Sequence, residues 1–294
     1  YPLGNYPIHP GDYSRNNREA AAVYISGEEN RIEGCEIAYA ATGVMLDGRN
    51  HVIRNCIITD IYGGNYFSGI YIAPFFPVDG IGPNYDAANV SCGGHLIERN
   101  TLARVSRGFI NIAEKTGGKG TTFQKMRILY NDMSDFMLNT EDGGAVYQWC
   151  VNGSGTEVAY NWIHGEHGGY AFNPALYADN NCLNFRYHHN VIWDVKLGIG
   201  WNCCQGWLEA YNNTIWARSG SVGIPGGPNV NNKVCNNLSN REFKDVTAER
   251  GTNNMTSGGF VGNPDKPVSG LDFRLASNSP AINAGMVITG VTDR

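Results

Sequence analysis

The residues most able to do chemistry in this chain of 294 residues gather between positions 141 and 216. All six tryptophans fall in the range 149–216. The same stretch holds the four acidic residues that are candidates for a catalytic role: Glu141, Asp142, Glu166 and Asp179. Exposed aromatic rings on a sheet stack against sugar rings or bind a covering loop or partner. A pair of carboxyl groups across a glycosidic bond catalyses its hydrolysis. We therefore expect a carbohydrate site, provided that a scaffold places these side chains on one surface.

A recurring segment, in which Asn follows an apolar strand and precedes another, indicates what that scaffold is. The asparagines of this repeat are Asn55, Asn100, Asn131, Asn161, Asn190, Asn213 and Asn237. The last three steps of the repeat, which end at Asn190, Asn213 and Asn237, are 29, 23 and 24 residues long. Repeats of this length bury their apolar faces by stacking on their neighbours, which makes a solenoid.

The composition favours short strands and turns over helices. Glycine is abundant at 38 residues, and charged residues make up 17% of the chain, against a usual value of about 25%. No amphipathic helix with good caps is evident. A propeller would need a period of about 40 residues and hairpin turns, which the sequence lacks. We expect an all-β fold, a right-handed parallel β-helix that forms one domain over residues 1–294.

Strand alternation assigns an inside and an outside to each repeat. The position two after each Asn should form one interior column: Ile57, Leu102, Met133, Ile163, Ile192 and Ile215. The flanking positions, which include Trp162, Trp193 and Trp216, should face outward. In the second strand of each repeat, alignment sets Tyr147 over Tyr177. It also puts three polar or aromatic residues in one column: Trp149, Asp179 and Asn202.

Three segments depart from the repeat. Residues 74–94 and 114–125 read as inserted loops, and long loops in compact domains are usually functional. Residues 260–294 read as a C-terminal closing segment. The chain begins at Tyr1 without Met, so we expect that a signal peptide or upstream segment has been removed and that N-terminal rungs are missing. Bare solenoid ends would allow self-association.

Charge and cysteine content limit the partners. A net charge of −5 offers no basic surface for nucleic acid, and no apolar run approaches the ~18 residues of a membrane span. The eight cysteines and five Asn-X-Ser/Thr sites favour a secreted protein. Cys35 and Cys56 begin the same strand motif 21 residues apart, so we expect contact, with a disulfide in an oxidising compartment. No Cys/His spacing matches a zinc site, so we expect no metal and no cofactor.

Several strings resemble a known family. DGGAVYQW at 142–149, LYADNNCLNFRYHHNVIW at 176–193 and YNNTIW at 211–216 resemble the core of the β-helical glycoside hydrolases that include α-L-fucosidases and xylan-acting enzymes. Residues 260–285 resemble the C-terminal closure of secreted polysaccharide-active β-helices. The resemblance implies Asp142 and Asp179 as the acid and base. The chain departs from the family at Asn180–Cys182 and in the loop 164–174.

Stacking gives the pair a geometry to test. Neighbouring rungs lie about 4.8 Å apart. Because Asp142 precedes its strand and Asp179 ends its own, their separation should exceed one rung, which favours the inverting range of about 6.5–9.5 Å. The alternative is that Asp142 only caps a Gly-Gly turn. Glu166 is a further candidate for the catalytic pair. The expected sugar-binding residues are Tyr147, Trp149, Tyr177, His164, His167 and Trp201.

Two other functions remain open at this point. A polysaccharide lyase would need a basic residue or Tyr as base, together with a cation beside a uronate, and Lys115 and Lys119 lie in one of the inserted loops. A non-catalytic structural or adhesive protein would use the same solenoid to form filaments. The leading prediction is a secreted glycoside hydrolase acting on a polysaccharide.

Overall fold

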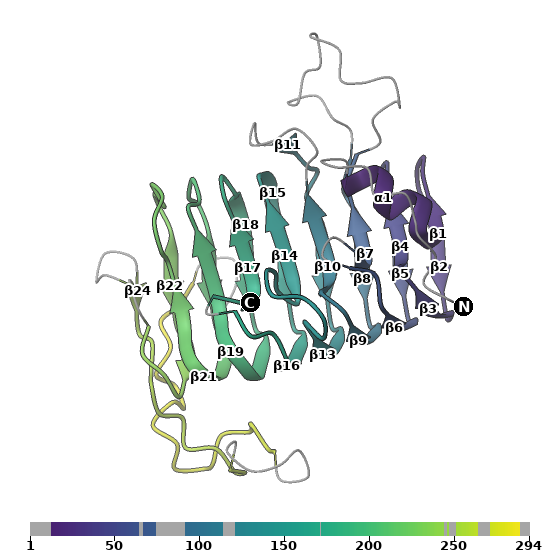
Figure 1. Cartoon of the computed structure of the whole chain (residues 1–294). Coiled ribbons are helices and arrows are strands. Elements are labelled where there is room, and N and C mark those ends of the chain that lie inside the picture. Colours follow the sequence, from purple (N-terminus) through teal and green to yellow (C-terminus); the bar gives the residue numbers. More distant parts are fainter. Residues whose placement is uncertain are drawn as a thin grey trace.

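The protein is a solenoid of stacked parallel strands, and it is nearly all β (Figure 1). The computed structural model describes residues 13–64, 67–74, 92–113, 121–170, 172–243, 246, 251–263 and 271–288. Successive rungs follow one another from the N-terminal to the C-terminal end (Figure 1). Every pair of named strands is parallel, as the predicted repeat requires.

The larger sheet has fourteen strands and bends into two arms joined by β19 (Val191–Asn202). The first arm contains β1 (Ala21–Ile25), β4 (Thr42–Leu46), β7 (Ser68–Ile72), β10 (Gly108–Ala113), β14 (Val146–Trp149) and β17 (Pro174–Asp179). The second arm contains β3 (Glu36–Ala40), β6 (Ile57–Ile61), β9 (Thr101–Val105), β13 (Asp132–Phe136) and β16 (Trp162–Glu166). The last rungs add β21 (Thr214–Gly223), which pairs with β19, and β23 (Leu238–Ser239).

The second sheet has ten strands and closes each rung. Its strands are β2 (Arg31–Glu33), β5 (Val52–Arg54), β8 (Leu96–Glu98), β11 (Thr121–Thr122), β12 (Arg127–Leu129), β15 (Val151–Ala159), β18 (Leu183–His188), β20 (Glu209–Tyr211), β22 (Lys233–Cys235) and β24 (Gly251–Thr252). Buried Ile, Val, Leu, Phe and Met side chains from both sheets form one continuous core.

The predicted interior column is confirmed from Leu102 onward, but it is wrong at its first member. Leu102, Met133, Ile163, Ile192 and Ile215 are register partners, and all are fully buried. Leu102 is paired with Ile58, whereas Ile57 is 47% exposed. In that rung Cys56 holds the place that Asn100 holds in the next, so counting from Asn55 shifts the register by one residue.

A ladder of asparagine side chains runs along one corner of the solenoid. Its members are Asn100, Asn131, Asn161, Asn190, Asn213, Asn237 and Asn254. Each Nδ2 donates to the Oδ1 of the next Asn at 2.9–3.0 Å. From Asn131 onward, each Oδ1 also accepts from the backbone N–H of the preceding ladder Asn, as when the Asn131 N–H donates to Asn161 at 2.9 Å. The amide side chains therefore satisfy backbone groups at the bend.

The bend itself depends on the residue before each ladder asparagine. Tyr130, Tyr160 and His189 hold φ values of 57°, 59° and 54°, in the left-handed region that asparagine and glycine usually fill. The ladder hydrogen bonds of the following residue keep this geometry in each rung. The stacked Tyr130 and Tyr160 rings, 4.9 Å apart, pack on the outside of the corner.

The N-terminal end holds a helix that the sequence reading missed. Helix α1 (Tyr13–Ala20) packs beside β1, β4 and β7. Asn17 is buried there and accepts a hydrogen bond from the Thr42 hydroxyl at 2.5 Å. Eight residues with no acid in the first turn give a weak helix signal, so packing against the sheet decides its formation. No described helix is long and apolar enough to cross a membrane.

The expected insertions lie mostly outside the described residues, at 75–91 and 114–120. Within the second one, Thr121–Thr122 joins β15 as a strand and is not loop. Cys35 and Cys56 lie in neighbouring rungs, where the Ile57 N–H donates to the Cys35 carbonyl at 2.9 Å. All eight cysteines are free thiols, so the disulfide is not formed in this structure. Each Sγ of this pair instead donates to a nearby carbonyl.

Candidate active site

A pocket of about 250 Å³ opens on the first arm of the larger sheet and contains both predicted catalytic aspartates. It is lined by Tyr71, Arg107, Asn111, Ala113, Asp142, Tyr147, Trp149, Asp179 and Asn180. The side chains come from the outer faces of β7, β10, β14 and β17 and from the segments that flank them. The predicted alignment is confirmed here, since Tyr147 pairs with Tyr177 and Asp179 lies between Trp149 and Asn202.

Asp179 is held at the end of β17 by a set of hydrogen bonds. Its Oδ2 accepts from the Tyr147 hydroxyl at 2.8 Å. Its Oδ1 accepts from Asn202 Nδ2 at 2.8 Å and from the Asn180 N–H at 3.0 Å. Asp179 as a whole is 6% exposed. Burial, reinforced by the negative charge of Asp142, raises the pKa of Asp179 above its ordinary value despite these donors.

Asp142 lies in the segment before β14 and remains exposed. Two glycines follow it, and a Cβ at Gly144 would lie 2.2 Å from the Pro174 carbonyl, so only glycine fits there. The Asp142 carbonyl accepts a hydrogen bond from Arg107 Nε at 2.7 Å. Among the described residues, nothing donates a hydrogen bond to its carboxylate. The turn-cap alternative required that carboxylate to be buried and bonded to backbone N–H groups, which it is not.

Aromatic rings and one cation form the floor of the pocket. The Arg107 guanidinium lies 4.5 Å from the centre of the Tyr147 ring, a cation–π contact. The rings of Tyr147 and Tyr177 meet edge to face at 5.1 Å. Burial, followed by the charge of Asp179, raises the pKa of both phenols far above its ordinary value. Both hydroxyls therefore stay protonated at neutral pH and act as hydrogen-bond donors.

Asn111 and Arg107 are pocket residues that the sequence reading missed. Asn111 is 3% exposed, lines the pocket, and its Oδ1 has no hydrogen-bond partner in the described structure. A buried polar atom without a partner marks a place where a ligand or water belongs. The register could have found Asn111, because it lies between Tyr71 and Tyr147 in one column. Nothing in the sequence distinguished Arg107.

Two of the proposed site residues lie inside the protein. Trp201 is fully buried, pairs in register with Ala178, and packs on Tyr187. Because Asn202 faces outward, strand alternation turns its neighbour Trp201 inward. The Glu166 side chain is also fully buried, with Oε2 2.6 Å from Arg218 and 3.1 Å from the Lys196 N–H. Neither residue lines the aspartate pocket.

The two proposed histidines lie on the second arm, away from the residues that line the pocket. His164 stacks on Trp193 with 4.2 Å between ring centroids and lies 3.5 Å from the Asp132 carboxylate. His167 lies 3.0 Å from the Asp135 carboxylate. Within the described part of the chain, no group of three or more His, Cys, Asp or Glu side chains is arranged to hold a metal ion.

The outward tryptophans are largely covered by the C-terminal segment. Trp193 and Trp216 are register partners, as predicted. Phe273 packs on Trp193 at 5.7 Å and Phe260 packs on Trp216 at 5.5 Å. Trp193 is consequently 9% exposed, whereas Trp162 remains 58% exposed. Of the three outward tryptophans, Trp193 is thus taken up by an internal contact between the solenoid and its tail.

Comparison with known proteins shows no family, and it finds distant similarity to solved structures. No family model matches the chain, and no curated protein matches it. Among solved structures, the chain is similar to a GH136 lacto-N-biosidase from Eubacterium ramulus, with 15% identity and a TM-score of 0.38. The match covers 71% of this chain and 50% of the other, so this chain spans about half of that protein's length. A likeness at this level carries no argument about activity.

Proposed function

We propose that this chain is a glycoside hydrolase that acts on a polysaccharide, with Asp179 as general acid and Asp142 as general base. The observation that carries the proposal is one pocket holding both carboxyl groups in different environments. Asp179 is buried and its pKa is raised, whereas Asp142 is exposed. Unequal environments for two carboxyls are how glycosidases assign the acid and the base.

The hydrogen bonds of Asp179 indicate which oxygen holds the proton. Oδ1 already accepts from two donors, Asn202 and the Asn180 N–H. Oδ2 accepts from the Tyr147 hydroxyl and from no amide or backbone N–H, so we assign to it the proton that goes to the leaving oxygen. Trp149 and the unpartnered Oδ1 of Asn111 would position the sugar, by ring contact and by accepting from a hydroxyl. Water activated by Asp142 would attack the anomeric carbon.

Two finer parts of the proposal concern stereochemistry and setting. We propose a right-handed single β-helix and inversion at the anomeric carbon, because one rung plus a lateral offset separates the two aspartates. We also propose that the protein is secreted, on the composition of the chain. Proton NMR of the first products formed from an active substrate would show whether the anomeric configuration is inverted.

The test of the main proposal is a panel of polysaccharides assayed for new reducing ends. Wild-type protein should release them from at least one substrate, and Asp179→Asn and Asp142→Asn should not. Asp132→Asn is the matched control, because Asp132 is a half-exposed carboxylate of the second arm. If no glycan is cleaved, or if the control loses as much activity as the pocket variants, the proposal is wrong.

A polysaccharide lyase is the second candidate, and Arg107 is the observation that favours it. Its guanidinium lies beside Tyr147 in the pocket, where it could neutralise a uronate carboxylate. The raised pKa of Tyr147 opposes a role for that phenol as the base. The two lysines considered for this function lie outside the described residues. Lyase action would appear as ultraviolet absorbance of an unsaturated uronate product, which hydrolysis does not give.

A further inference from the structure

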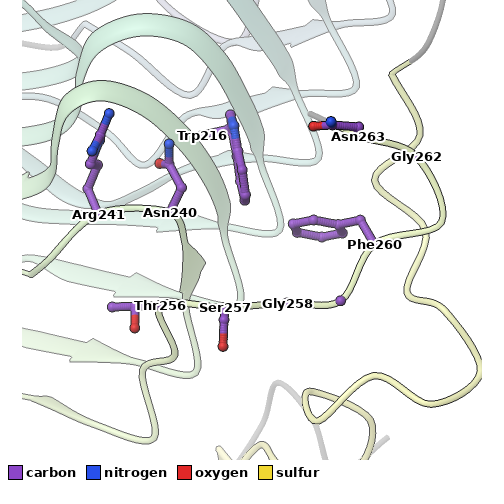
Figure 2. A pocket seen from close by; sticks show the side chains of 10 residues that line it. Trp216, Asn240, Arg241, Thr256, Ser257, Gly258, Phe260, Gly262 and Asn263 are labelled. Carbon is purple, nitrogen blue, oxygen red and sulfur yellow. The ribbon is translucent and has the colours of Figure 1, made fainter. Parts of the chain in front are cut away.

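A second hollow lies at the C-terminal end of the solenoid and shares no lining residue with the aspartate pocket. It has a volume of about 530 Å³ and is lined by Trp216, Asn240, Arg241, Thr256, Ser257, Gly258, Gly259, Phe260, Gly262 and Asn263. One wall is the last rungs, with Arg241, Asn240 and Trp216 in a row, and the facing wall is the tail that carries Phe260 (Figure 2).

The walls of this hollow are built by defined contacts. Tail residues form an antiparallel pair in which the Val261 N–H donates to Arg274 at 2.8 Å and the Gly262 N–H donates to Asp272 at 3.0 Å. Asn240 donates to and accepts from the Ala217 backbone at 3.0 and 2.9 Å. Its amide therefore supports the wall and is not offered to a ligand.

The groups that a ligand would meet in this hollow are one cation, two hydroxyls and an aromatic wall. Arg241 is exposed, and its Nε donates to the Ala217 carbonyl at 3.2 Å, which leaves its two terminal nitrogens facing solvent. Thr256 and Ser257 are exposed and make no hydrogen bond within the described chain. Phe260 is partly exposed and meets Trp216 edge to face at 5.5 Å, so the hollow has an aromatic wall.

The charge balance of the hollow favours an anion. None of its ten lining residues is acidic. Asp272 is the one carboxylate within residues 251–263 and 271–288, and Arg274 lies 2.6 Å from it. Glu242 follows Arg241 in the chain but does not line the hollow. A guanidinium matches a planar carboxylate with two parallel N–H donors, and an aromatic ring beside it suits a sugar face.

We infer that this hollow, the Trp216–Arg241 groove, is a binding site for an acidic saccharide, a glycan segment that carries a carboxylate. Binding of the acidic glycan in the groove is thus separate from the aspartate pocket. The groove could hold one part of a glycan while another part of it, or another chain, enters the pocket. The inference does not depend on catalysis, because the groove shares no residue with the pocket.

The experiment measures binding by calorimetry, with oligogalacturonate as the acidic probe and xylo-oligosaccharide of the same length as the neutral one. It is done in the Asp179→Asn background, so that no probe is consumed. Oligogalacturonate should bind more tightly than the neutral probe. Arg241→Gln should weaken that binding about tenfold, since a charge-assisted hydrogen bond is lost. Arg31→Gln, which removes an exposed cation in the N-terminal rung, should leave it unchanged.

A second variant covers the case in which Arg241→Gln disturbs the last rung. Ser257→Asp places a negative charge on an exposed side chain in the groove and should abolish binding of oligogalacturonate, while Ser257→Asn should not. The inference is overturned if the acidic probe does not bind, if the neutral probe binds equally well, or if both groove variants bind as the Arg31→Gln control does. Loss of groove binding with intact hydrolysis, or the converse, separates this inference from the proposed function.

Discussion

The two arms of the larger sheet present the same kind of strand but surround their buried carboxyl groups differently. On the first arm, Asp179 is buried beside another carboxylate and Asn111 Oδ1 has no partner. On the second arm, Glu166 pairs with Arg218, and the Trp193 ring is covered by Phe273. An unpartnered amide oxygen and a carboxyl group beside another acid leave a ligand something to bind in the pocket, whereas a carboxylate paired with a guanidinium and a covered ring stabilise the fold. Residue types able to do chemistry therefore become a candidate site where an open pocket gathers them and no cation is paired with the buried carboxyl group.

The largest expected difference between the arms is catalytic. Asp179→Asn should lower kcat/KM by roughly 10²–10⁴-fold, the usual contribution of a general acid, while circular dichroism and the melting temperature stay near those of the wild type. In the wild type, kcat/KM should fall as pH rises through the pKa of Asp179, since the acid must be protonated. Equal loss in Asp132→Asn would erase the distinction between the arms.

Glu166→Gln should have the reverse profile. The variant keeps the shape of the side chain but removes the ion pair with Arg218. We expect the free energy of unfolding to fall by about 2–3 kcal/mol, which is less than for a fully buried pair because Arg218 is partly exposed. Activity per folded molecule should not change. Urea unfolding and kcat measured on the same preparation would check both statements, and a large drop in kcat would return Glu166 to the candidate catalytic pair.

Removing the ring of the C-terminal segment that covers Trp193 should have a smaller effect on stability. Phe273→Ala deletes a ring that packs on Trp193, and because Phe273 is only partly buried we expect a loss of about 1–2 kcal/mol. Tryptophan fluorescence should shift to the red as Trp193 meets water. Tyr39→Ala is a control, since that ring is 81% exposed and its removal should change neither stability nor fluorescence.

The smallest effect concerns the stability of the pocket itself. The pKa of Asp179 is raised from 3.8, so in the window above that value the folded state binds more protons than the unfolded state. The free energy of unfolding therefore falls as pH rises through the window. Asp179→Asn removes this fall in the free energy of unfolding. The variant should therefore be slightly more stable than the wild type at neutral pH but not in strong acid. Thermal unfolding of both proteins at a series of pH values checks this. If the pKa of Asp179 were not raised, the melting temperatures of the variant and the wild type would differ by the same amount at every pH.

Much of the fold could be predicted because, in a repeat protein, residues that stack on one another lie one repeat apart in the sequence. The Asn ladder, the column from Leu102 to Ile215 and the stacking of Tyr147 on Tyr177 all follow from alternation and period. The errors came where a rung used a different residue for the same role. Cys56 replaces the ladder Asn, and the prediction moved to Ile57 in place of Ile58.

The candidate site was predicted only as far as strands carry it. Asp179 and Trp149 are strand residues, so their column was readable. Trp201 was misplaced although the same alternation that puts Asn202 outside puts Trp201 inside. Arg107 reaches the pocket by bonding the carbonyl of Asp142, a contact between segments 35 residues apart that no periodicity encodes.

The sequence by itself determined the solenoid, its register from Leu102 onward and the side from which Tyr147 and Asp179 project, because a period of two along each strand and a rung of about 23–29 residues leave few alternatives. Only the tertiary structure decided which polar groups are satisfied. Burial beside Asp142 raises the pKa of Asp179, a buried ion pair takes Glu166 out of reach of the pocket, and the tail covers Trp193. Each of these outcomes depends on segments distant in the chain meeting in space, and the free energy of a charge or a ring is set by what surrounds it.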